Sequence, residues 1–322
     1  MKIVVFGPEK RVGVWAGDLV VDLARASGAK LPSDLLGLIN GGPAALAEAA
    51  RVVDAALAAP VAERSAKGVY AIADVALHAP QVPGARIACA GGNFADHMAA
   101  MAKRSGRADF DTSDMDAVRK HVRSRGIWGF WKVGSDAAGP GADIMYPSRT
   151  KRLDYEAELA IVLGKPAKDA KAGDLASYVW GVTLFGDWSI RDQNEGTTTF
   201  KFAMAKNFDG SYSVGPCIVV NEGLDPANID VETYVNGDRR QHYNTRDMCI
   251  SFGEYLEYLS TDLTLKPGDM ISGGTAAGTA ADSSERSPEG VAFPERFLKP
   301  GDKVEMRSPQ IGTLAAQIIA KR

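Results

Sequence analysis

The stretch "RLDYEAELAIVLGK", residues 152–165, contains the pattern that decides the fold and the site. Asp154, Glu156 and Glu158 occupy every second position, and a long apolar run follows them. In an extended strand alternate side chains share a face, with same-face neighbours roughly 7 Å apart, so the two glutamates point the same way. From residue 159 onwards both faces are apolar. The pattern predicts a strand that enters the protein interior with paired carboxylates at its start.

Two adjacent buried carboxylates need another group beside them. A buried carboxylate without a partner takes up a proton, so Glu156 and Glu158 require protonation, a basic side chain or a cation. A divalent ion satisfies both glutamates at once. Taken alone, the pair is at least as typical of a solvated strand end, because glutamate is common at strand edges.

The next long strand adds residues of the same chemistry. The segment "VWGVTLFGDWSIRDQN" runs apolar and then places Asp187 after a glycine, with Arg191 four residues later. The segment "AKNFDG" supplies Lys206 and Asp209. Carboxylate oxygens suit the hard ions Mg²⁺, Mn²⁺ or Ca²⁺ better than zinc, and no histidine or cysteine spacing of a zinc site competes. We therefore expect a metal site built from carboxylates.

The composition limits the class of partner. The chain has 322 residues, with 37 Lys+Arg against 40 Asp+Glu and a formal net charge of −3. This near balance lacks the positive surplus typical of nucleic-acid or anionic-lipid binding, so we expect a small-molecule partner, no nucleic acid and no membrane. The three cysteines lack disulfide or zinc spacing and indicate free thiols. We expect a cytoplasmic protein, because the first apolar run is too brief for a signal sequence.

Breaks in the pattern predict a small N-terminal domain, residues 1–80, and a larger domain, residues 85–322. Val-rich extended runs and an Ala-rich helical segment make the first domain an α/β unit. The Pro/Gly-rich passage of residues 78–85 is the expected boundary. Strands dominate the rest of the chain, and the pair Asn236-Gly237 predicts a two-residue hairpin. The predicted fold class is therefore α+β.

Six motifs follow one another over roughly residues 85–280: "NFADH", "LDYEAELAIVLGK", "GDWSIRD", "AKNFDG…VGP", "NGDRRQHYNTRDM" and "SGGTAAG". Together they resemble the fumarylacetoacetate hydrolase family, including its fumarylpyruvate and acylpyruvate hydrolases. The motifs occur in the family's usual order, which is more specific than any single motif. The resemblance implies a mixed β-roll domain, a homodimer, and Mg²⁺ or Mn²⁺ held by Glu156, Glu158 and Asp187. It also implies action on 2-oxo or β-diketo acids.

The resemblance further assigns catalytic roles. His97, the histidine of the family's N-[YF]-x-D-H stretch, is expected to be the base that activates water against a substrate carbonyl. Lys206 and Arg191 are expected to stabilise developing negative charge while a metal-stabilised enolate leaves. The implied reaction is metal-dependent hydrolysis of a C–C bond in a β-diketo acid of the acylpyruvate type.

Five further residues are expected to bind the substrate: Lys132, Arg119, Arg123, Asn194 and Thr275. Each also has a simpler structural explanation. Lys132 suits a snorkelling surface lysine, and the two arginines, four residues apart, suit a solvated helix face. Asn194 stands where the family commonly has glutamine and suits a turn, as does Thr275 after two glycines.

One departure from the family pattern affects the expected reaction. Many members have a glutamate three residues after the histidine, where this chain has Ala100. Glu195 and Glu285 are the candidates to orient His97 instead. Without such a partner, a dehydratase of a 2-keto-3-deoxy sugar acid, a 2-oxo acid decarboxylase or an isomerase fits the same site, since these reactions need no water nucleophile. A non-catalytic metal-binding protein is the alternative from another class.

Overall fold

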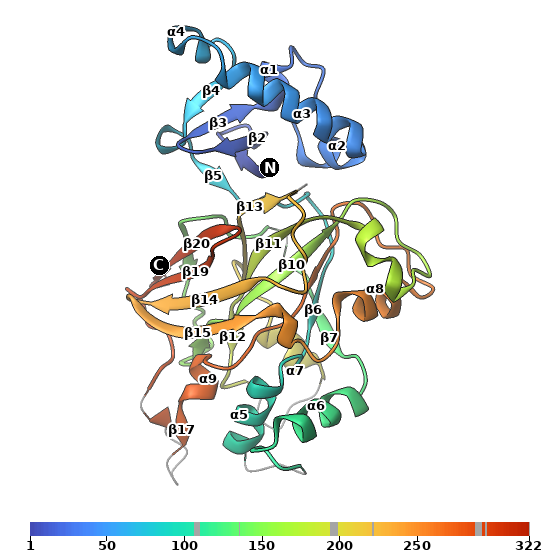
Figure 1. Ribbon diagram of the computed structural model, residues 1–322. Coiled ribbons are helices and arrows are strands. Elements are labelled where there is room, and N and C mark those ends of the chain that lie inside the picture. Colours follow the sequence, from blue (N-terminus) through green and yellow to red (C-terminus); the bar gives the residue numbers. More distant parts are fainter. Residues whose placement is uncertain are drawn as a thin grey trace.

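The fold is α+β, as the sequence predicts, with two mixed sheets packed together and helices at both ends of the molecule (Figure 1). The computed structural model describes residues 1–105, 110–134, 136–193, 199–220, 222–286, 292–293 and 295–321. Within these ranges no helix is long and apolar enough to cross a membrane.

The larger sheet has eleven strands in the described part of the chain and runs from the N-terminal segment into the rest of the molecule. Its order is β4 (Val69–Ala71), β3 (Leu19–Asp22), β2 (Arg11–Ala16), β1 (Lys2–Phe6), β13 (Tyr212–Val219), β11 (Val179–Asp187), β10 (Ala157–Leu163), β16 (Met270–Ser272), β6 (Ile87–Ala90) and β7 (Gly129–Lys132), with β5 (Leu77–His78) also paired to β1. Most neighbours are antiparallel, whereas β16 and β6 are parallel.

A second sheet covers one face of the first. Its order is β15 (Asp238–Asn244), β14 (Asp230–Val235), β19 (Lys303–Ser308), β20 (Gly312–Ile319) and β8 (Ala142–Met145). Two short pairs complete the described strands: β9 (Leu153–Asp154) with β12 (Ser189–Ile190), and β17 (Glu285–Arg286) with β18 (Ala292–Phe293). Asn236 and Gly237 form the two-residue hairpin between β14 and β15, with φ of 52° and 87°. Positive φ at both positions is the geometry that this dipeptide favours, so the predicted hairpin is confirmed.

The helices divide between the two ends of the molecule (Figure 1). The N-terminal end carries α1 (Leu23–Ala26), α2 (Leu35–Asn40), α3 (Gly42–Leu57) and α4 (Val61–Arg64). The opposite end carries α5 (Ala95–Ser105), α6 (Met115–Ser124), α7 (Thr199–Ala205) and α9 (Ala280–Ser283), and α8 (Phe252–Ser260) lies along one side.

Strand β10 is buried along its whole length and separates two hydrophobic cores. Leu159 and Ile161 face the core shared with the second sheet, whereas Ala160 and Val162 face the core shared with the N-terminal helices. Apolar residues on both faces are what a strand buried on both sides requires. The predicted inward course of this strand is therefore confirmed.

The proposed division between residues 1–80 and 85–322 stays a prediction. β1 pairs with β13 of the larger part, with Ile3 opposite Ile218. The core on that side also mixes residues from both parts of the chain, including Leu38 of α2 and Phe185 of β11. The two parts thus share one sheet and one core.

Candidate metal centre and active site

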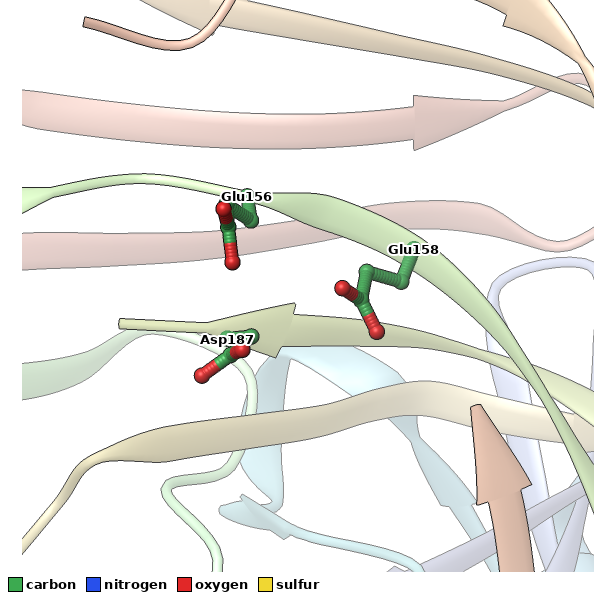
Figure 2. Close-up of side chains that lie close together, drawn as sticks. All are labelled: Glu156, Glu158 and Asp187. Carbon is green, nitrogen blue, oxygen red and sulfur yellow. The ribbon is translucent and has the colours of Figure 1, made fainter. Parts of the chain in front are cut away.

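Three carboxylates gather where β10 begins and β11 ends. The two strands are antiparallel neighbours with Ala157 opposite Gly186, and the Asp187 N–H donates to the Glu156 carbonyl at 2.9 Å. This register places Glu156, Glu158 and Asp187 together, each offering a carboxylate oxygen within 4.8 Å of the others (Figure 2). All three side chains are buried. The cluster thus follows from alternation along one strand and from its pairing with the next.

Two buried lysines neutralise part of this charge. Lys206 Nζ donates to the Glu156 carboxylate, to Asp187 Oδ2 at 2.7 Å and to Ser189 Oγ at 2.7 Å. Lys132 Nζ donates to the other Asp187 oxygen and to two backbone carbonyls, those of Lys206 at 2.6 Å and Ser211 at 3.0 Å. Each ammonium group therefore has its three protons engaged. Lys132 is fully buried and is not a snorkelling surface lysine.

Arg191 completes the charged network. Its Nη2 donates to Glu156, and its Nε donates to Asp154 at 2.8 Å. Four carboxylates, those of Asp154 and of the three residues of the cluster, thus face three cations, Lys132, Lys206 and Arg191. With every carboxyl ionised the network has a formal charge of −1, and a bound divalent ion would make it +1. An anionic substrate would be attracted to such a site.

The pKa values of the two glutamates are shifted in opposite directions. Burial raises the pKa of both, but Arg191 and Lys206 outweigh it at Glu156, whose pKa is held well below the usual range. Burial together with the Asp187 and Glu156 charges raises the pKa of Glu158 well above the usual range. Among the described residues the hydrogen bond to Glu158 comes from the neutral hydroxyl of Ser272. Glu158 therefore holds its proton to higher pH than an exposed glutamate does, and a bound cation would displace that proton. An all-oxygen set of this kind fits Mg²⁺ or Mn²⁺.

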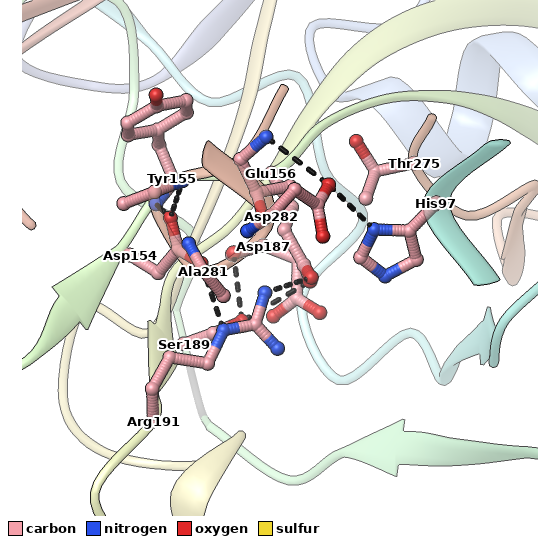
Figure 3. Close-up of polar contacts among 12 residues, drawn as sticks. His97, Asp154, Tyr155, Glu156, Asp187, Ser189, Arg191, Thr275, Ala281 and Asp282 are labelled. Carbon is pink, nitrogen blue, oxygen red and sulfur yellow. Dashed lines mark hydrogen bonds and ion pairs between the residues drawn. The ribbon is translucent and has the colours of Figure 1, made fainter. Parts of the chain in front are cut away.

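His97 lies in the first turn of α5 and pairs with a carboxylate from a distant part of the chain (Figure 3). Its Nδ1 is 2.9 Å from Asp282 Oδ2, which also accepts from the N–H groups of Gly278 and Thr279 at 3.1 and 3.3 Å. An oxygen that accepts these bonds leaves Nδ1 as the donor, so the Nε2 atom is the basic one. Burial lowers the pKa of His97, but the Asp282 carboxylate outweighs it, and the pKa is raised.

Asp282 is not among the residues that the sequence predicts to orient His97. The predicted candidates are Glu195, which lies outside the described residues, and Glu285, whose side chain is not described. One sequence signal was available, because Thr279-Ala-Ala-Asp282 has capping-box spacing and forms that box at the start of α9. The signal predicts a helix start; it gives no indication that the box faces His97, 185 residues away.

Comparison with known proteins identifies the family. The model of the fumarylacetoacetate (FAA) hydrolase C-terminal domain matches residues 86–319. The chain belongs to the fumarylacetoacetate hydrolase family.

Relatives within this family carry different activities. Oxaloacetate tautomerase YisK of Bacillus subtilis is 32% identical over 253 residues, which cover 78% of this chain and 75% of that protein. Among solved structures, the fumarylacetoacetate hydrolase of Exiguobacterium antarcticum has a TM-score of 0.73 and 28% identity, with full coverage of both chains. A maleylpyruvate hydrolase of Sphingobium sp. SYK-6, solved with manganese(II) and pyruvate, has the same fold, with a TM-score of 0.71 and 24% identity over both full chains. Family membership thus leaves hydrolase and tautomerase activities open.

The residues predicted to bind substrate occupy different environments in this family member. Thr275 is buried beside β10, where its hydroxyl donates to the Ala157 carbonyl at 2.8 Å and accepts from Gln241 at 2.9 Å. Arg119 on α6 donates to the Asp247 carbonyl at 3.3 Å. These contacts fix backbone or loop segments, and a role in binding substrate stays a prediction for both.

Arg123 and Asn194 are two more of the residues predicted to bind substrate. Arg123, also on α6, donates to the Cys249 carbonyl at 2.5 Å and to Glu254 at 2.7 Å, so its guanidinium connects α6 to α8 and to the segment before it. Asn194 lies outside the described residues. Substrate binding by either residue stays a prediction.

Removing one carboxylate of the cluster is expected to abolish tight metal binding. Glu158→Gln keeps the size of the side chain but leaves a poor ligand, so we expect Mn²⁺ affinity to fall by more than about 100-fold, beyond the usual effect of an outer-shell change. Asp209→Asn, which alters an exposed carboxylate close to Lys206 in the chain, is the control and should leave affinity unchanged. Electron paramagnetic resonance of free Mn²⁺ measures both. Equal affinities in the two variants would contradict the site.

Metal affinity is also expected to depend on pH through Glu158. Below its raised pKa the carboxyl holds a proton that the ion must displace, so Mn²⁺ affinity should increase with pH until that proton is gone. Ser272→Ala removes a hydrogen bond that favours the ionised form, which should shift the rise to higher pH. Calorimetric titrations across a pH series test this. A rise in Ser272→Ala at the same or lower pH would contradict it.

Proposed function

We propose that this protein is a metal-dependent hydrolase that cleaves a C–C bond of an acylpyruvate-type β-diketo acid, with Mg²⁺ or Mn²⁺ at the carboxylate cluster. The observation that carries the proposal is the pairing of His97 with Asp282 beside that cluster. The pairing supplies the orienting carboxylate that the family's usual position lacks in this chain. It therefore supports His97 as a general base, the role that activation of a water requires.

Each group of the site has a separate role in the proposed reaction. A divalent ion held by Glu156, Glu158 and Asp187 would polarise the carbonyl oxygens of a chelating 2-oxo acid. Nε2 of His97 takes a proton from water as the water oxygen bonds to the carbonyl carbon farther from the carboxylate. Asp282 holds the Nδ1 proton in place and stabilises the imidazolium that forms.

Bond cleavage follows from the addition. The C–C bond to the methylene carbon breaks, and its electron pair passes to the pyruvate part as an enolate. His97 then returns its proton to the methylene carbon, so that water has been divided between a carboxylic acid and pyruvate. The nearby charges of Lys206 and Arg191 stabilise the negative charge on the dicarbonyl during these steps. Because the protons of Lys206 are engaged with two carboxylates and the Ser189 hydroxyl, we assign it an electrostatic role rather than a direct hydrogen bond.

A tautomerase is the second candidate, because relatives named oxaloacetate tautomerase cover most of the chain, including one from Bos taurus that is 28% identical over 314 residues. Moving a proton between carbon and oxygen requires an acid–base group but no water nucleophile. The same His97 would serve. The two functions therefore differ in product rather than in the residues involved.

The test follows acylpyruvate and fumarylpyruvate-type compounds by loss of enol absorbance with Mn²⁺, with products identified by mass. We expect pyruvate and a carboxylic acid as products. His97→Ala should lower kcat by about 10²- to 10⁴-fold, the usual contribution of a general base. Asp282→Asn should also lower kcat. His242→Ala, which alters an exposed histidine, should leave kcat unchanged.

Each other outcome has a definite meaning. Faster enol–keto conversion of oxaloacetate without cleavage of any acylpyruvate would replace the hydrolase by the tautomerase. Turnover of a 2-keto-3-deoxy sugar acid, or carbon dioxide from a 2-oxo acid, would favour the dehydratase or decarboxylase. Full activity in His97→Ala would contradict the assigned base. A homodimer and a cytoplasmic location remain part of the proposal, and light scattering tests the first.

A further inference from the structure

Asp154, the first carboxylate of the strand motif, is not among the three clustered metal ligands, yet it is completely buried. Its Oδ1 accepts from the N–H groups of Tyr155 at 2.9 Å and Ala280 at 2.7 Å. Its Oδ2 accepts from Arg191 Nε at 2.8 Å and from the N–H of Ala281 at 3.1 Å (Figure 3). A buried carboxylate with four donors is strongly fixed, and it fixes its donors in return.

The donors lie on two elements with separate roles. Arg191 follows β12 and contacts Glu156 of the metal cluster. Ala280 and Ala281 form the first turn of α9, which also contains Asp282, the partner of His97. Asp154 therefore connects Arg191, which contacts the metal cluster, with the helix turn that carries Asp282.

Within the described residues, α9 is also held by apolar packing of Ala280 and Ala281 and by two further hydrogen bonds. The Tyr155 hydroxyl donates to the Gly278 carbonyl at 3.0 Å, and Arg104 donates to the Ala281 carbonyl at 3.1 Å. The capping box between Thr279 and Asp282 acts within the turn and shapes it without attaching it to the sheet. Asp154 binds the N–H groups of Ala280 and Ala281, whereas Asp282 binds those of Gly278 and Thr279.

We infer that Asp154 is a positioning residue that sets the place of Asp282, and through it the orientation of His97, relative to Arg191 and the metal-binding carboxylates. The catalytic part of this inference rests on the proposed function. The structural part, that Asp154 controls the contact between Asp282 and His97, stands without it.

Replacement by asparagine tests the role of the carboxylate at nearly constant volume. Each Asp154 oxygen accepts two N–H groups, so an amide NH₂ at either position would face two donors and lose both hydrogen bonds. Ala280→Pro is the second variant. It removes one N–H from the other side of the contact and leaves Asp154 and its charge in place. Proline is tolerated at the first position of a helix, so the turn can still form.

Asp22 provides a matched control in the N-terminal part of the chain. It is also completely buried, accepts from Arg11 Nε at 2.7 Å and accepts from the N–H of Arg25 at the start of α1 at 3.0 Å. Asp22→Asn therefore removes a buried, arginine-paired carboxylate of the same kind far from the site. It should lower stability without changing the environment of His97.

The first readout needs no substrate. A histidine N–H bonded to a carboxylate gives a far-downfield proton signal in nuclear magnetic resonance, and the His97 signal is assigned by its loss in His97→Asn. We expect this signal in the wild type and in Asp22→Asn. It should be absent in Asp282→Asn, and weakened or shifted in Asp154→Asn and Ala280→Pro. An unchanged signal in both Asp154→Asn and Ala280→Pro, or no such signal in the folded wild type, would overturn the inference.

The second readout is kinetic. If Asp154 acts through Asp282, Asp154→Asn should lower kcat by about 10²-fold with little change in KM, as a displaced catalytic group does. In an Asp282→Asn background the same change should cost no more than about threefold, because the two residues act together. Equal effects in the two backgrounds would overturn the coupling. Wild-type inactivity on every substrate would contradict the proposed function alone and leave the magnetic resonance comparison to decide the role of Asp154.

Discussion

Four carboxylates buried at the junction of two strands form the constraint on which the rest of the site depends. Isolated buried charges are unstable, so Asp154, Glu156, Glu158 and Asp187 require cations and hydrogen-bond donors around them. Lys132, Lys206 and Arg191 supply three positive charges, so one of the four negative charges is not balanced. The carboxylate without a cationic partner is Glu158, which in the described structure is paired with a neutral hydroxyl. The same buried carboxylates thus form both the charged network and the candidate metal site.

The network also connects the two halves of the proposed chemistry. Glu156 contacts Arg191, Arg191 contacts Asp154, and Asp154 binds the turn that carries Asp282. His97 is oriented at the far end of this chain of contacts. Because each link is either a charge-assisted hydrogen bond or the single turn of α9, His97 and the carboxylate cluster are held in one network. Hydrolysis and proton transfer both need an acid–base group of this kind, and product analysis separates the two activities.

Local patterns in the sequence predict much of this structure. The two apolar faces of β10, the Asn236-Gly237 hairpin and the carboxylate cluster depend on alternation, turn chemistry and adjacent strands. The His97–Asp282 pair could not be predicted, since it depends on where a four-residue helix docks, 185 residues from the histidine. The burial of Lys132 could not be predicted either, because lysine is almost never fully buried unless it is paired, and its partner Asp187 lies far along the chain. Local sequence reports which residues are charged; tertiary packing decides which charges meet.

Three carboxylates are expected to hold a divalent ion although lysines already contact two of them. Anomalous X-ray scattering from crystals grown with Mn²⁺ tests this expectation. We expect one strong peak bounded by Glu156, Glu158 and Asp187, with metal–oxygen distances of about 2.0–2.6 Å, the range for hard divalent ions. Lys206 Nζ should remain close by, displaced from the ion. A fully folded crystal form with no peak between these carboxylates, or with Mn²⁺ bound elsewhere, would show that the cluster is not a metal site.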